Sequence, residues 1–451
     1  MKQDTIAAIA TAMSNSGIGI VRISGEESID IVKKIYSGKE LKDHAIHYGY
    51  IKDGEETIDE VLVMVMKAPH SFTGEDTVEI NCHGGVYVVK RILETVIKAG
   101  SRPAEPGEFT KRAFLNGKMD LSQAEAVIDI INSKNEYALK SSVSQLKGNV
   151  QKKIKEIRAE ILYHTAFIET ALDDPEHISV DGYGDKLRIT VGNLLEELDK
   201  LLKSSENGRM IKEGIKTVIV GKPNAGKSSL LNILVGEERA IVTDIEGTTR
   251  DVLEESIQFH GINLNIIDTA GIRNTEDIVE KIGVNKAKEQ ASEADLIIYV
   301  VDASRQLDQN DFDIIEMIRD KKAIILLNKS DLATVVTKDM VQSYIDKPMI
   351  EISAKEESGI QELEKTLKNM FFDGEISFND EVYITNIRHK AALKNAYESL
   401  KKVMFSIEND MPEDFYSIDL LDAYESLGSI TGETIGEDLV NEIFSKFCMG
   451  K

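Results

Sequence analysis

Tryptophan is absent from this chain of 451 residues, and Phe and Tyr bring the aromatic share to only 6%. The chain also has few basic residues, with 54 Lys and Arg against 78 Asp and Glu and a formal net charge of −24. Broad nucleic-acid-binding surfaces combine basic side chains with aromatic ones that stack on bases. The composition therefore does not indicate a protein of that kind, and we expect any contact with RNA to be local or to be supplied largely by a partner.

Cysteines and long apolar runs are also scarce. The only two cysteines, Cys82 and Cys448, lie far apart, have no metal-binding spacing and indicate a reducing compartment. The longest apolar runs, such as residues 61–66, have the length of a strand and are too short to cross a bilayer. Asp4 stands where a signal peptide has basic residues. We therefore expect a cytoplasmic protein without a membrane segment.

The strongest positive signal is a glycine-rich loop between a strand and a helix. The β-branched run 218–220 leads into 221–229, which reads G-x-x-x-x-G-K-S-S, and an apolar helical segment follows. Backbone N–H groups of such a loop bind phosphate oxygens, while Lys227 reaches the β- and γ-phosphates and the Ser228 hydroxyl holds Mg²⁺. A glycine loop with a solvated lysine is the alternative, but the strand and helix that the motif requires are both present.

Four downstream segments complete a guanine-nucleotide site. Thr249 offers a hydroxyl to Mg²⁺ and the γ-phosphate, Asp268 holds a water on Mg²⁺, and the Gly271 N–H faces the γ-phosphate. Asp331 accepts two hydrogen bonds from guanine N1 and N2, which adenine cannot supply, and the 353–355 segment lies beside the base. The predicted GTP-binding residues are Asn224, Ala225, Gly226, Lys227, Ser228, Ser229, Gly247, Thr248, Thr249, Asp268, Thr269, Ala270, Gly271, Asn328, Lys329, Ser330, Asp331, Ser353, Ala354 and Lys355.

Two positions set the hydrolysis chemistry apart from that of Ras-like switches. Ile272 stands where those proteins have a glutamine that orients the attacking water, so the water needs another anchor. Residues 274–282 offer carboxylates, Glu280 among them, although the segment also reads as a solvated acidic helix start. The amide oxygen of Asn224 can coordinate a monovalent cation in place of an arginine finger, but asparagine is also an ordinary turn residue. Whether Arg250 is an internal finger stays open.

The order of the segments predicts a multidomain protein. It comprises an α+β domain at 1–118, an α-helical bundle built from the two segments 119–211 and 376–451, and an inserted α/β Ras-like P-loop GTPase domain at 212–375. Asn207-Gly208 marks a break before the nucleotide domain. Within the bundle, one apolar stripe marks a long helix; it is formed by Leu146, Val150, Ile154, Ile157 and Ile161. The proline-rich loop 102–110 reads equally as a functional loop or as a rigid connector.

Several further motifs resemble, over the full length, the MnmE (TrmE) family of tRNA modification GTPases. They are 4–6 with 21–25, 83–85, 106–110, 113–121, 247–251 and the C-terminal Phe447-Cys448-Met449-Gly450-Lys451. The family usually has isoleucine where Met449 stands, which is a volume-conserving difference. The C-terminal motif together with an inserted GTPase domain makes this resemblance specific.

The resemblance implies a homodimer formed through N-terminal domains that bind a reduced folate, 5,10-methylene- or 5-formyl-tetrahydrofolate, at Arg22, Glu79, Lys118 and Lys451. It implies K⁺ ligands at Asn224, Thr243, Ile245 (through its carbonyl) and Thr248, and Mg²⁺ ligands at Ser228 and Thr249. It extends the GTP-binding set to Thr243, Asp244, Ile245 and Glu246, and assigns the orientation of the water to Glu280, beside the catalytic Lys227 and Thr249. It also implies an FAD-dependent MnmG-like partner in a heterotetramer that modifies C5 of the wobble uridine of tRNA. Cys448 is a site residue whose role stays open.

Two other classes of GTPase are weaker alternatives. A ribosome-assembly GTPase that acts as an RNA-binding switch often carries a KH-type module with a G-x-x-G loop. From residue 377 onward the chain has no G-x-x-G, and residues 415–443 contain no Lys or Arg. A membrane-associated GTPase would need a basic amphipathic helix or a lipidation signal, and neither is present. The sequence therefore favours the tRNA-modifying class.

Overall fold

The computed structural model describes residues 4–178, 182–237, 255–267, 294–372, 383–448 and 450. The chain divides into two compact units. One unit comprises Met1–Ile131, Gln145–Val191 and Glu398–Lys451, and the other comprises Asn132–Ser144 and Gly192–Tyr397. Within the described residues, no helix is long and apolar enough to cross a membrane.

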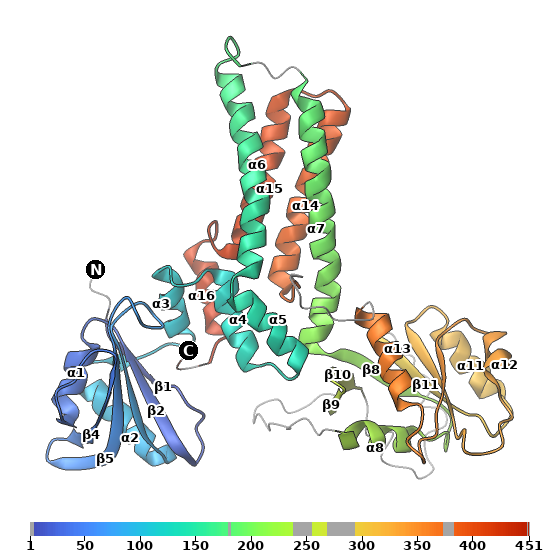
Figure 1. The fold of residues 1–451 in the computed structure, drawn as a ribbon, viewed down its shortest axis with the longest axis horizontal. Helices are drawn as coiled ribbons and strands as arrows, with labels where there is room; N and C mark the ends of the chain where they lie inside the picture. The colour runs from blue at the N-terminus through green and yellow to red at the C-terminus, as the bar shows by residue number, and fades with distance from the viewer. Residues whose placement is uncertain are drawn as a thin grey trace. The chain divides into compact units, whose positions relative to one another are not determined.

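The first unit contains a seven-stranded sheet with two helices on one face (Figure 1). Valine and isoleucine alternate with polar residues along its strands, so one face is apolar and packs against α1 and α2. The strand order is β3-β4-β5-β6-β2-β1-β7. The elements are β1 (Ile6–Ile9), β2 (Ser16–Ser24), α1 (Ser28–Ile35), β3 (Tyr36–Gly38), β4 (Ala45–Asp53), β5 (Glu56–Met66), β6 (Thr77–Gly84), α2 (Val86–Ala99) and β7 (Arg102–Pro103).

Helices form the rest of this unit and connect it to the second unit. The pair α6 and α15 packs side by side along most of its length (Figure 1). Two long helices, α7 and α14, contribute residues to both units. The helices are α3 (Glu108–Leu115), α4 (Leu121–Ile131), α5 (Glu136–Leu146), α6 (Asn149–Asp173), α7 (Tyr183–Glu213), α14 (Ile387–Glu408), α15 (Glu413–Thr431) and α16 (Glu437–Ser445).

The second unit is built on a six-stranded sheet in the order β13-β12-β11-β8-β10-β9, parallel except for β9. Its central strands are apolar on both faces because helices cover both. The core on one face includes residues of α8 and α13, and the core on the other includes residues of α11 and α12. The elements are β8 (Ile215–Val220), α8 (Lys227–Glu237), β9 (Glu255–Phe259), β10 (Ile262–Ile266), β11 (Leu296–Asp302), α11 (Gln309–Ile318), β12 (Ala323–Asn328), α12 (Lys338–Gln342), β13 (Met349–Glu351) and α13 (Ile360–Phe372).

The architecture confirms the predicted fold class but corrects two local predictions. Asn207-Gly208 is no break, because both residues lie inside α7. Gly208 is explained by packing, since a Cβ there would lie 2.3 Å from the carbonyl oxygen of Ile384. Leu146 does not share the long helix with the rest of the apolar stripe. It ends α5, and Gly148, in a left-handed conformation at φ 88°, separates that helix from α6.

Candidate functional site

The glycine-rich loop lies at the carboxyl end of β8, between the central strand and the N-terminus of α8. Gly221 and Gly226 have φ of 151° and 102°, which disfavour any side chain. A Cβ on Gly221 would lie 2.4 Å from the Val300 carbonyl oxygen, and one on Gly226 would lie 2.0 Å from the Asn328 amide. Both glycines are therefore required by the packing of the loop as well as by its conformation.

Lys227, the first residue of α8, points back into the loop. Its ammonium group donates to the carbonyl oxygens of Gly221 and Lys222, at 2.6 and 2.8 Å. Burial lowers the pKa of Lys227 below its ordinary value. The loop thus brings a poorly solvated positive charge to a helix N-terminus, where backbone N–H groups and the helix dipole favour phosphate.

Asn328 joins the phosphate loop to the loop after β13. It is only 2% exposed and ends β12. Its amide nitrogen donates to the Ala225 carbonyl at 2.8 Å, and its amide oxygen accepts from the Ala354 N–H at 3.0 Å. Three segments that lie far apart in the sequence are therefore held in one arrangement by a single side chain.

The predicted guanine-recognising carboxylate is fixed beside this asparagine. Asp331 accepts a hydrogen bond from the Ser353 hydroxyl at 2.7 Å, and this bond lowers the pKa of the exposed Asp331 carboxyl group. Ser330 also donates its backbone N–H to the Ile352 carbonyl at 3.1 Å. The 328–331 and 353–355 segments thus meet as the sequence predicted, with an ionised carboxylate at the surface.

The sequence reading missed Asp302, which is only 6% exposed at the end of β11. Asp302 accepts from the Lys329 ammonium at 2.5 Å and from the Ser304 hydroxyl at 2.6 Å. Lys329 has a φ of 68°, so the ion pair stabilises a residue in an unfavourable backbone conformation. The signal was available, because Asp302 directly follows the apolar run 296–301.

Many of the predicted site residues lie outside the described residues, among them the whole 243–249 segment and the residues after β10. They are Thr243, Asp244, Ile245, Glu246, Gly247, Thr248, Thr249, Asp268, Thr269, Ala270, Gly271, Glu280 and Lys451. Ile272 and Arg250 also lie outside. Asn224 is described; it is exposed and has a φ of 61°, a left-handed conformation that asparagine tolerates well.

A second polar site lies on the face of the N-terminal sheet opposite α1 and α2. Arg22 and Glu79 are cross-strand partners on β2 and β6, and the Arg22 Nε lies 2.7 Å from a Glu79 carboxylate oxygen. Arg22 also donates to the Gly450 carbonyl at 3.2 Å. Phe72 and Phe109 lie with their ring centroids 5.8 and 5.7 Å from the guanidinium carbon. The structure therefore brings the end of the chain to the predicted Arg22–Glu79 pair.

Of the other two residues of this predicted site, Lys118 is described and Lys451 lies outside the described residues. Lys118 is exposed and donates to the Pro69 carbonyl at 2.9 Å, in the same loop as Phe72. Cys448 is also exposed, and its carbonyl accepts from the Gly107 N–H at 3.3 Å. A Cβ on Gly450 would lie 2.3 Å from the Ile9 carbonyl oxygen, so glycine lets the tail lie against β1. By contrast, Cys82 is buried, and burial raises the pKa of its thiol to about 11.

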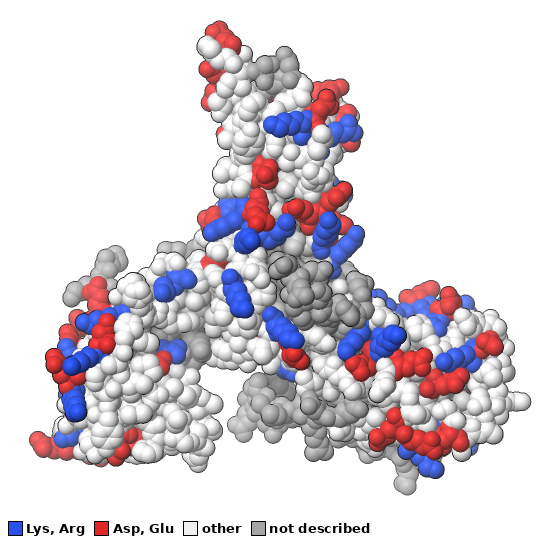
Figure 2. Space-filling view, viewed as in Figure 1, with Lys and Arg blue, Asp and Glu red and all other residues white. Residues whose placement is uncertain are grey.

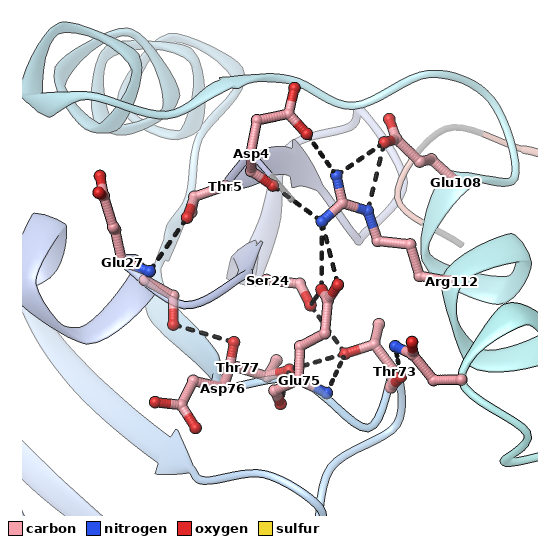
Figure 3. A network of polar contacts seen from close by, with 12 residues as sticks. Asp4, Thr5, Ser24, Glu27, Thr73, Glu75, Asp76, Thr77, Glu108 and Arg112 are labelled. Atoms are coloured by element: carbon pink, nitrogen blue, oxygen red, sulfur yellow. Dashed lines mark hydrogen bonds and ion pairs between the residues drawn. The ribbon is translucent and has the colours of Figure 1, made fainter. Parts of the chain in front are cut away.

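A network of charged side chains centred on Arg112 holds the elements around this second site (Figure 3). Arg112, only 5% exposed, contacts the carboxylates of Asp4, Glu75 and Glu108 at 2.9, 3.2 and 3.0 Å. Arg102 bonds to Asp4 and Glu108 as well. The network joins the start of β1, the loop before β6 and α3, which carries Phe109. The motifs at 4–6 and 106–110 are thereby explained as parts of a positioning network.

Comparison with known proteins places these sites in a family. A model described as "MnmE helical domain" matches residues 121–448, and one described as "GTP-binding protein TrmE N-terminus" matches residues 5–118. A protein of Lachnoclostridium phytofermentans named "tRNA modification GTPase MnmE" is 61% identical over 100% of both chains. Proteins of the same name from Acetivibrio thermocellus and Clostridioides difficile are 51% and 49% identical, over 100% and 99% of each chain.

The chain belongs to the MnmE family. The resemblance read from the sequence motifs is thereby confirmed over the full length, and the two family models together cover both polar sites. Among solved structures, the G domain of the T. maritima FeoB iron transporter covers 34% of this chain and 96% of its own, at 24% identity and a TM-score of 0.27. That score is too low to support an argument about function.

Proposed function

We propose that this MnmE-family protein hydrolyses GTP to drive the modification of C5 of the wobble uridine in tRNA, with a reduced folate as the one-carbon donor. The relatives at 49–61% identity are named as tRNA modification GTPases, which gives the class of enzyme. The GTP-binding part of the proposal is supported most directly by the two hydrogen bonds of the Asn328 side chain. They join the phosphate loop to the loop after β13, and so hold the proposed phosphate-binding and base-recognising segments together.

The described part of the nucleotide site fits GTP and Mg²⁺. Lys227 brings a half-buried positive charge to the place where negative charge develops on the phosphoryl oxygens. Ser228 is exposed at the second position of α8, and its hydroxyl and that of Thr249 are the proposed Mg²⁺ ligands. Mg²⁺ would supply further charge stabilisation there. Asp331, ionised and oriented by Ser353, accepts the two guanine N–H groups.

A K⁺ ion is the proposed substitute for an arginine finger. Asn224 lies in the phosphate loop with a left-handed backbone conformation, and its side chain is exposed. Its amide oxygen is therefore available to a cation. Thr243, the Ile245 carbonyl and Thr248 are the other proposed ligands. K⁺ would supply the positive charge that the transition state of phosphoryl transfer needs. Glu280 is the proposed group that orients the attacking water, since Ile272 cannot do so.

The Arg22–Glu79 pair is the proposed folate site. Its carboxylate suits the aminopyrimidine edge of a pterin, while Arg22, Lys118 and Lys451 suit the carboxylates of the glutamate tail. The partly exposed Phe72 ring near Arg22 offers apolar surface to a flat ring system, while the buried Phe109 packs near the same guanidinium group. Since the Cys448 backbone is bonded to Gly107 of the same region, its exposed thiol is a candidate participant in the chemistry.

We further propose that two copies form a homodimer through the N-terminal domains and act with an FAD-dependent partner protein. The experiment that tests the function as a whole is mass spectrometry of wobble nucleosides in tRNA from a strain that lacks this protein. Loss of the C5-substituted uridines, restored by the wild-type gene and not by an Asp331→Asn variant, is the expected result. Unchanged wobble uridines in the deletion strain would contradict the proposal, and defective ribosomal subunits instead would favour the ribosome-assembly alternative.

A further inference from the structure

The start of α6 carries a cluster of lysines in a chain that is otherwise strongly acidic. Residues 147–158 contain five Lys and Arg and a single acid, Glu156, against a net charge of −24 for the whole chain. Four of these side chains form what we call the lysine surface: Lys147, Lys152, Lys153 and Lys155. All four belong to the first of the two compact units, together with the N-terminal sheet and the end of the chain.

Helix stability does not explain the lysine surface. Acidic residues stabilise the N-terminus of a helix and basic residues its C-terminus, because of the helix dipole. In α6 the polarity is reversed. The first turn has no acid and ends at Lys152, and the last turn has no basic residue and ends at Asp173. The lysines therefore lie where they weaken the isolated helix, which points to a role outside it.

Neighbouring carboxylates neutralise the charge of only some of these lysines. Lys147 and Lys152 are exposed and make no ion pair within the described part of the chain. Lys153 lies 4.0 Å from Glu156. Lys155 acts electrostatically on Glu433, but that carboxylate is already bonded to Arg158 at 2.5 Å. The lysine surface thus keeps a net positive charge that faces solvent.

Two of the lysines, Lys152 and Lys155, share the outward side of α6 with an aromatic side chain. Lys152 and Tyr163 are separated by eleven residues, or three helical turns, and so point the same way. Tyr163 is 58% exposed, and Lys155 lies one turn above Lys152 on the same side. In Figure 2, Lys and Arg side chains lie among Asp and Glu side chains over the lower part of the helices.

Hydrogen bonds connect the segment before the lysine surface to α4, which follows the N-terminal domain. Gln123 near the start of α4 donates to the Leu146 carbonyl at 2.9 Å, and Gln145 donates to the Ser122 carbonyl at 2.7 Å. The start of α4 follows three residues after Lys118, which contacts the Phe72 loop. A long anionic ligand that binds the lysine surface is therefore close to the helices that lead to the Arg22–Glu79 pair.

We propose that the lysine surface is the docking site for the phosphate backbone of tRNA. The inference rests on the proposed function, which requires a tRNA to approach a chain whose net charge repels it. Three exposed lysines at 147, 152 and 155 fit RNA phosphates, and the half-exposed Tyr163 ring, which carries the Lys186 ammonium at 5.8 Å, lies two to three turns further along the helix. The rival occupant is the acidic α15 face of a second copy, where Asp414, Asp422 and Glu425 are exposed.

The test uses the full chain without nucleotide and an unmodified tRNA transcript, with the dissociation constant measured over a series of salt concentrations. The triple variant Lys147→Gln, Lys152→Gln, Lys155→Gln removes the charges and keeps the helix. Each lost phosphate contact reduces the slope of log affinity against log salt by about one. We expect a slope that is shallower by about two to three and an affinity at low salt that falls by roughly tenfold or more.

The matched control is Lys39→Gln, Lys42→Gln, Lys90→Gln, which removes three exposed lysines of the N-terminal domain. It should leave the slope and affinity of tRNA binding unchanged, and both variants should keep wild-type GTP turnover and helix content. Wild-type binding with an unaltered slope in the lysine-surface variant overturns this proposal and leaves the proposed function standing. Absence of tRNA binding by the wild-type chain overturns direct docking altogether. Loss of dimer with unchanged tRNA affinity overturns it in favour of the second copy.

Discussion

At the scale of single residues, the two polar sites depend on side chains that connect distant segments. Asn328 bonds to segments 103 and 26 residues away, and Arg22 bonds to a carbonyl 428 residues away. Such residues have low exposure and bond to more than one segment, so their removal leaves polar groups without partners. Residues at the surface of the same sites, such as Asp331, are free to meet a ligand and can be altered without disturbing the fold.

The first prediction concerns the choice of base. Asp331→Asn should weaken GTP binding by roughly tenfold to hundredfold, because an amide cannot accept both guanine N–H groups. The same change should increase the affinity for xanthine nucleotide, whose ring offers a matching carbonyl. Titration with fluorescent nucleotides measures both affinities. An exposed acid outside the site, Asp339→Asn, is the control, and equal affinities in Asp331→Asn and wild type would remove the assignment.

The second prediction concerns the folate site. Glu79→Ala should lose at least roughly tenfold in affinity for 5-formyl-tetrahydrofolate, since one charge-assisted hydrogen bond contributes about that much. GTP affinity should not change, because the two sites lie in different units. Calorimetry on the full chain measures both. Glu60→Ala, on the neighbouring strand β5, is the matched control, and unaltered folate affinity in Glu79→Ala would show that the pterin binds elsewhere.

At the scale of elements, glycines decide where segments approach one another. The α7 glycine Gly208 lies inside a long helix, where alanine usually stabilises by about 1 kcal/mol. Its missing Cβ leaves room for the carbonyl of Ile384, in the segment that returns toward α14. The two helices that join the units are therefore placed by a backbone contact as well as by their apolar stripes.

The third prediction follows from that contact. Gly208→Ala should destabilise the protein, by about 1–3 kcal/mol as is typical of overpacking, because a backbone carbonyl cannot move aside cheaply. Gly184→Ala in the same helix meets only the Ile407 methyl at 3.8 Å and should be neutral or slightly stabilising. Denaturant unfolding of both variants measures the difference. Equal stability of the two variants would show that residues 383–386 shift to accommodate the added methyl group at little cost.

The fourth prediction concerns pH and the network that holds α3. Burial by itself raises the pKa of Glu108, but hydrogen bonds from Arg102, the Glu105 N–H and Arg112 bring its pKa below the ordinary 4.5. The stabilisation is therefore complete above pH 4.5 and is lost as the pH falls through the lower, folded-state pKa. Glu108→Gln should lower the melting temperature at neutral pH. On acidification, the melting temperature of this variant should fall less than that of the wild type. The exposed Glu105→Gln should keep the wild-type profile.

At the scale of the whole molecule, hydrolysis is proposed to need a cation and a second copy. An ion held by Asn224 and the 243–249 segment would order the segment through which two nucleotide domains meet. Both α7 and α14 contribute residues to the two compact units of each chain. Under this proposal, the rate of hydrolysis depends on the state of the dimer.

The fifth prediction tests that requirement. A missing transition-state charge is worth roughly 10³–10⁵ in rate, so GTP turnover should be many-fold faster in KCl than in NaCl at equal ionic strength. Asn224→Ala should lose the K⁺ response, and Glu280→Ala should turn over slowly with normal GTP binding. Glu276→Ala, in the same acidic segment, is the control. Equal rates in the two salts would overturn the cation role, and full activity of Glu280→Ala would overturn the water-orienting role.

The sequence by itself determined the GTPase class and the fold class, because the phosphate loop and the 328–331 and 353–355 segments are short contiguous motifs at strand ends. Their chemistry follows from local order and from the strand and helix that flank them. The apolar stripe of α6 was equally local, apart from Leu146, whose helix ends at Gly148.

Only the tertiary structure decided which distant residues meet. The Arg22–Gly450 bond, the Phe72 and Phe109 rings and the Arg112 network join segments with no common period or spacing in the sequence. The sequence predicted a break at Gly208 because a single sequence does not distinguish a glycine in a solvent-exposed turn from one that packs against a backbone carbonyl. Contacts between segments hundreds of residues apart depend on how the chain packs, and local propensity carries no record of them.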